Sequence, residues 1–73
     1  MNKQAAQRIL TEIAKTCKIP KQDLLLAKQS TTNENFEIQI EKSLTETEWL
    51  CLEEIIANHT LRLTIAGNLL VIY

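Results

Sequence analysis

Residues 43–73 constrain the fold more than any other stretch, because a strong helix start is followed directly by a short hairpin. Thr45 and Glu48 have the spacing of a capping box, in which each side chain bonds the backbone amide of the other residue. Leu44 and Trp49 stand where a hydrophobic staple forms around such a box. The apolar residues that follow at helical spacing are Trp49, Leu52, Ile55 and Ile56. The sequence therefore predicts an amphipathic helix with its cap at Thr45.

The remaining residues, 61–73, have the pattern of a β-hairpin. Leu61-Arg62-Leu63-Thr64-Ile65 alternates with period two, and Gly67-Asn68 suits a two-residue loop. Such a loop fixes the register of the two strands, and directly opposed residues share one face of a sheet. The opposed pairs are Ala66 with Leu69, Ile65 with Leu70, Leu63 with Ile72, and Arg62 with Tyr73.

The two faces of this predicted hairpin differ in character. One face is aliphatic and should pack on the helix: Leu61, Leu63, Ile65, Leu70 and Ile72. The other face carries Leu69, Val71 and Tyr73 beside Arg62 and Thr64. A strand that is apolar on both faces is either central in its sheet or covered by something else. We therefore predict a partner-binding surface at Leu69, Val71, Tyr73 and Arg62, with Leu50 as a second exposed candidate off the buried stripe of its helix.

The N-terminal half begins with a second amphipathic pattern. Residues 1–18 place apolar side chains on one helical face: Ala6, Ile9, Leu10, Ile13 and Cys17. Ile19-Pro20 should stop this helix, because the residue before a proline avoids helical backbone angles.

Residues 21–28 are ambiguous, since a short apolar run fits either a buried strand or one turn of a helix. We favour a strand, because a polar loop at 29–35 and a cleanly alternating strand at 36–41 follow it. The chain then forms one α+β domain, residues 1–73, in the order helix–strand–strand–helix–strand–strand. Its natural packing has two layers: a four-stranded, mainly antiparallel sheet, with both helices on one face.

Charge is unevenly distributed along the chain. Residues 1–28 hold six Lys or Arg against two acids, whereas residues 29–73 hold two against seven. The basic side chains of interest are Arg8, Lys15, Lys18, Lys21 and Lys28. They support a second hypothesis, a small nucleic-acid-associated regulator. Against it, the net charge is −1, the chain has one Tyr, one Phe and one Trp, and nucleic-acid binding normally needs basic and aromatic surfaces.

No residue pattern predicts a catalytic site, cofactor or metal. Cys17 and Cys51 lack C-x-x-C spacing, and the N-terminus has no signal-peptide pattern, so we expect reduced thiols in a cytoplasmic protein. His59 has no paired motif, and with the two cysteines it is too scattered for a zinc site. No apolar run reaches the length that spans a bilayer.

The leading hypothesis is thus a non-enzymatic protein-interaction or regulatory module. We expect it to dock on a protein partner, or to form a homodimer, through the open sheet face and the C-terminal strand. A chain of 73 residues has a marginal core, which makes a partner or a second copy physically reasonable.

Overall fold

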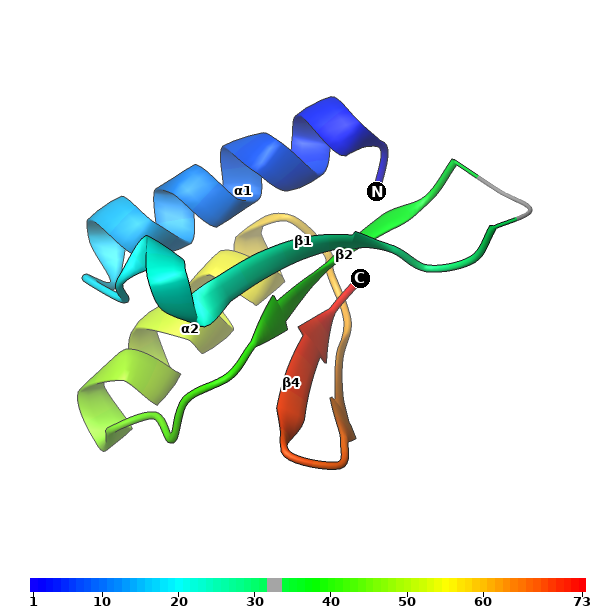
Figure 1. Cartoon of the computed structure of the whole chain (residues 1–73). Helices are drawn as coiled ribbons and strands as arrows, with labels where there is room; N and C mark the ends of the chain where they lie inside the picture. The colour runs from blue at the N-terminus through cyan, green and yellow to red at the C-terminus, as the bar shows by residue number, and fades with distance from the viewer. Residues whose placement is uncertain (32–33) are drawn as a thin grey trace.

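The computed structural model describes residues 1–31 and 34–73 and shows the element order that the sequence predicts (Figure 1). The helices are α1 (Lys3–Thr16) and α2 (Glu46–Asn58). The strands are β1 (Leu24–Lys28), β2 (Phe36–Ile40), β3 (Leu63–Ala66) and β4 (Leu69–Ile72), and a 3-10 turn, η1 (Lys21–Asp23), precedes β1. Thr32 and Asn33, which belong to the predicted polar loop, lie outside the described residues.

Both helices begin where a side chain caps them. The capping box of α2 is confirmed: the Glu48 amide donates to Thr45 Oγ1 over 3.2 Å, and the Thr45 amide donates to Glu48 Oε1 over 2.9 Å. In α1 the Ala5 amide donates to Asn2 Oδ1 over 2.7 Å. Helix α1 ends at Thr16 with Cys17 as its C-cap, because Lys18 takes a left-handed backbone conformation (φ 57°) just before Ile19-Pro20.

The apolar run within residues 21–28, which could have been strand or helix, is a strand. The first three residues form the turn η1, and Leu24–Lys28 then forms a strand that pairs antiparallel with β2. The preference for a strand is therefore confirmed for the part that contacts the sheet.

The strands form one antiparallel sheet in the order β1-β2-β4-β3. The predicted register of the second hairpin is confirmed at every pair, and Arg62 and Tyr73 extend it by exchanging two backbone hydrogen bonds. Strand β4 is central, which explains its apolar residues on both faces. The C-terminal strand therefore has no free edge through which a second copy could pair, because β2 and β3 flank it and the edges are β1 and β3.

Both helices cover the same face of this sheet, as predicted (Figure 1). The helices and the strands contribute to one core of buried side chains: Ile9, Ile13, Cys17, Ile19, Leu24, Ile38, Ile40, Leu52, Ile55, Leu70 and Ile72. Ile65 is an exception to the prediction, since 70% of its surface is exposed. The reason is its place on the outermost strand, above an open hollow of about 290 Å³ that Leu44 and Trp49 also line.

The two cysteines correct a further prediction. Cys17, at the end of α1, and Cys51, in α2, form a disulfide with a Cα–Cα separation of 5.6 Å. Reduced thiols were predicted because the two residues lack C-x-x-C spacing and the N-terminus has no signal-peptide pattern. The packing of the two helices decides their proximity, and spacing alone could not show it. Disulfides are rare in the cytosol, so this pair gives no support to the predicted cytoplasmic location, which was inferred from the lack of a signal-peptide pattern.

Candidate functional site: the open sheet face and a basic groove

The sheet face opposite the helices is built from four strands in a known register. One row across it is Leu25, Gln39, Val71 and Thr64, and the adjacent row includes Ala27, Glu37, Tyr73 and Arg62. The core side chains of both helices pack on the other face. This second face, which we call the open sheet face, therefore carries a mixture of apolar and charged side chains.

The apolar stripe predicted on β4 lies on this face, but it is less accessible than expected. Val71 is only 6% exposed, because the flanking strands place Gln39 and Thr64 on either side of it. Leu69 is half-buried, and Tyr73 is 37% exposed. The accessible apolar surface of β4 is therefore concentrated at Tyr73.

Strand β1 adds an apolar residue that the sequence analysis did not select. Leu25 is 51% exposed and lies opposite Gln39 on the open sheet face. Residues 21–28 were ambiguous between strand and helix, so the direction of the Leu25 side chain could not be fixed from the sequence. Leu50, a predicted partner residue, is 62% exposed but lies on α2, in the helical layer, and so does not join this face.

Acidic and basic side chains lie on opposite sides of the open sheet face. Glu37 and Glu41 lie on or next to β2, and the Gln39 side chain donates to Glu37 Oε2 over 2.8 Å. Arg62 lies across β4 from Glu37 and is exposed. Within residues 1–31 and 34–73 no ion pair engages Glu37, Glu41 or Arg62. Their charges are thus free to meet a binding partner.

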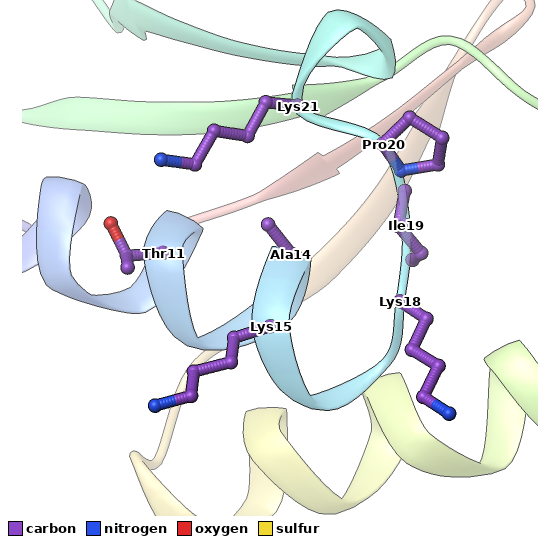
Figure 2. Close-up of a pocket in the computed structure, with 7 residues that line it drawn as sticks. All are labelled: Thr11, Ala14, Lys15, Lys18, Ile19, Pro20 and Lys21. Carbon is purple, nitrogen blue, oxygen red and sulfur yellow. The ribbon is translucent and has the colours of Figure 1, made fainter.

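The structure also brings together part of the predicted basic patch. Lys15, Lys18 and Lys21 line a groove of about 560 Å³ between the end of α1 and the turn into β1 (Figure 2). Figure 2 draws Lys15 and Lys21 extending to one side of Ala14, whereas Lys18 extends to the other. The residues that line this groove include no acid.

The other two residues of the predicted basic patch differ in their positions. Arg8 lines a neighbouring hollow of about 520 Å³, which shares Thr11 with the groove. Lys28 lies at the end of β1, 4.0 Å from the Glu34 carboxylate, and lines neither hollow. The structure therefore brings four of the five basic residues onto the side of the molecule formed by α1 and the turn that follows it.

His59 and Glu48, whose side chains could in principle act in catalysis, each contact a neighbouring side chain that stabilises the fold. His59 Nε2 lies 3.1 Å from Glu12 Oε1, and this exposed pair joins the end of α2 to α1. Hydrogen bonds from the Lys42 side chain and from the Thr45 backbone amide lower the pKa of Glu48, so this carboxylate serves the start of α2. Among the described residues no three His, Cys, Asp or Glu side chains are grouped as metal ligands.

No helix in residues 1–31 or 34–73 has both the length and the apolar character that a membrane crossing requires. Comparison with protein families, curated proteins and solved structures finds no match to this chain.

Proposed function

We propose that this chain is a non-enzymatic protein-interaction module that docks through its open sheet face. Its partner is a protein surface with an apolar centre and Lys or Arg side chains beside it. The observation that supports this proposal is a sheet face free of helices, on which exposed apolar side chains stand beside carboxylates that form no ion pair within residues 1–31 and 34–73. Complementary charges of this kind orient partners and disfavour wrong ones.

The residues of this face have separate roles in the proposal. Tyr73 and Leu25 supply accessible apolar area, and Tyr is enriched at the centres of interfaces. Leu69 and Val71 lie beside Tyr73 on β4, separated from Leu25 by β2, and Val71 is already buried, so it supports this surface without adding accessible area. Glu37 and Glu41 attract basic groups on one side, while Arg62 selects an acidic or polar group on the other.

The burial of Val71 determines how the proposal is tested. Lysine at that position would place a charge inside the sheet and would unfold the chain for reasons unrelated to docking. The better variant is Leu25→Ser with Tyr73→Ser, because both side chains are accessible. Leu50→Ser is a matched control, because it removes a leucine of comparable exposure from the helical layer.

The experiment is affinity capture from cell extract by all three proteins, followed by binding of the purified captured protein to each. We expect the wild type and Leu50→Ser to bind that protein alike, and the double variant to lose binding. Equal binding by all three overturns the proposal. Sedimentation of the wild type identifies a second copy as the occupant if its mass doubles and the double variant restores the monomer mass.

One observation favours a second candidate function, that of a nucleic-acid-associated regulator. The groove at Lys15, Lys18 and Lys21 has no acidic residue in its lining, and Arg8 lines the adjoining hollow. Binding of a single-stranded oligonucleotide there should weaken steeply with salt, because each neutralised phosphate releases a counterion. Lys15→Ala with Lys21→Ala should flatten this salt dependence, whereas Lys42→Ala, outside the groove, should not. An affinity that does not change with salt contradicts this function.

The cytoplasm is the compartment that the sequence predicted for this module, and it stays a prediction. Trapping of the thiols in cells that express the chain tests it, because the cytosol keeps most thiols reduced. A reduced Cys17–Cys51 pair supports the cytoplasmic location, and an oxidised pair contradicts it.

A further inference from the structure

Strand β3 presents unpaired backbone groups on the free edge of the sheet. Arg62 and Tyr73 exchange both backbone hydrogen bonds, over 2.8 and 3.0 Å, so they are a hydrogen-bonded pair of the antiparallel ladder. Such pairs alternate with pairs that do not exchange hydrogen bonds. Thr64 and Ala66 therefore bond to β4, and the N–H and C=O groups of Leu63 and Ile65 point away from it.

The side chains at this edge are apolar as well. Leu63 and Ile65 share the face that the helices cover, yet Ile65 is the most exposed large apolar residue in the described part of the chain. Below it lies the hollow lined by Leu44 and Trp49. An exposed edge with an apolar side chain next to it is a template for another strand, unless charges, a bulge or a covering loop protect it.

We propose that β3 pairs antiparallel with β3 of a second copy of this chain, with Thr64 facing Thr64 of that copy. This register is self-complementary, as a two-fold interface requires. Leu63 then faces Ile65 of the second copy, and Ile65 faces its Leu63. Both are the residues whose backbone groups point outwards, so the two pairs form four new hydrogen bonds.

The side chains fit this register on both faces. On the helical face, Leu63 and Ile65 of each copy lie beside each other and bury the surface that Ile65 leaves exposed. On the open sheet face the central pair is Thr64 with Thr64, a cross-strand combination that stabilises sheets. The one charged side chain next to this segment, Arg62, faces Ala66 of the second copy and so meets no like charge.

The other edge of the sheet is a poorer site for a second copy. The Gln29 amide bonds to Asn35, and the Glu41 amide bonds to Asp23, so the outward backbone groups on β1 belong to Leu24, Leu26 and Lys28. Lys28 puts a charge on that edge, a common protection against pairing. Strand β3 has no charged residue among its four.

This inference concerns a different surface from the proposed docking face and does not rest on it. The two-fold axis runs perpendicular to the sheet, so pairing at β3 makes one continuous eight-stranded sheet. Both open sheet faces then lie on the same side, which doubles the surface available to a partner.

A cysteine at the centre of the predicted register tests the pairing. In a facing pair without hydrogen bonds the two Cα atoms lie about 4.5 Å apart, a separation that a disulfide can bridge. Under mild oxidation Thr64→Cys should therefore cross-link into a dimer. Ala66→Cys is the control: it is on the same strand and face, but its two copies would lie about 13 Å apart along the strands. Equal cross-linking of both variants, or of neither, overturns the proposal.

A second measurement does not depend on added cysteines. At high micromolar concentration the wild type should sediment at twice the 8.4 kDa mass of the chain, and Ile65→Lys should halve that mass. Because Ile65 is exposed, this variant should keep the wild-type circular dichroism spectrum. A monomeric wild type, or a dimer that survives Ile65→Lys, overturns the proposal.

The two proposals can fail separately, because they use different residues. When Leu25→Ser and Tyr73→Ser are combined with Thr64→Cys, the chain should still cross-link as efficiently as Thr64→Cys alone. Loss of partner binding with retention of this cross-link assigns docking to the open sheet face and pairing to β3. Loss of the cross-link in the combined variant would contradict pairing through β3.

Discussion

The two helix–hairpin units of this protein share an order of elements but differ in how their outer strands are covered. In the first unit, α1 contacts both β1 and β2, and the inward residues Leu24 and Ile38 are buried. In the second unit, the inward residues of β4 are buried, but Ile65 of β3 is 70% exposed. A side chain that points toward the helical layer is thus buried only where a helix lies above it.

Charge separates the same two units. The basic residues that line the groove beside α1 come from the first unit, whereas α2 begins with Glu46 and Glu48 and contains Glu53 and Glu54. The Cys17–Cys51 disulfide and the contact between His59 and Glu12 join the two helices. The two units are therefore unequal, and they are joined both by the pairing of β2 with β4 in one sheet and by these links between their helices. The following experiments test how far they differ.

The largest effect is expected at the disulfide. Replacing Cys17 and Cys51 by Ala should lower the free energy of unfolding by about 4 kcal/mol, because a cross-link between residues 34 apart restricts the unfolded chain. Chemical denaturation of the oxidised wild type and of the variant measures the difference. A reductant should destabilise the wild type and leave the variant unchanged. Equal stability of the two proteins would show that the helices need no link.

The next experiment compares inward positions on the outer strands of the two hairpins. Leu24→Ala should cost about 2–5 kcal/mol, because it leaves a cavity in a buried site on β1. Ile65→Ala should cost less than about 0.5 kcal/mol at dilutions where the chain is monomeric, because the side chain is exposed there. Urea melts of both variants provide the values. Similar losses would mean that the second unit is covered as well as the first.

Removal of the helix caps should have a smaller effect on stability. Two variants compare the starts of α1 and α2. Thr45→Ala removes the capping box of α2 and should cost about 1 kcal/mol. Asn2→Ala removes the single cap of α1 and should cost the same or less, since it loses one hydrogen bond. Thermal melts monitored at the helical circular dichroism band measure both. A greater loss for Asn2→Ala would reverse the expected order.

The smallest effect is expected in the stability of the protein at acidic pH. The hydrogen bond from Lys42 Nζ to Glu48 Oε2, 2.8 Å long, is the main cause of the lowered pKa of Glu48. A carboxyl with a lowered pKa in the folded state stabilises the protein above its unfolded pKa, and this contribution is lost as the pH falls through the folded value. The melting temperature should therefore fall below about pH 4, and less so in Lys42→Ala. An identical acid profile for both proteins would contradict this assignment.

The sequence by itself determined the local structure of this protein. Capping residues, helical and alternating periodicity, and the Gly67-Asn68 loop depend on neighbours in the chain, so they gave the element order and the hairpin register correctly. They also showed that Leu69, Val71 and Tyr73 share a face. The sequence could not assign residues 21–28 to strand or helix, because a short apolar run has no period that distinguishes the two.

Only the tertiary structure decided what lies beside and above each element. It placed β4 between β2 and β3, which buried Val71 and made β3 an edge. It brought Cys17 to Cys51, and it left Ile65 without a helix above it. These outcomes depend on contacts between residues distant in sequence. A local pattern is compatible with several neighbours, so it cannot show which of them an element packs against in the folded chain.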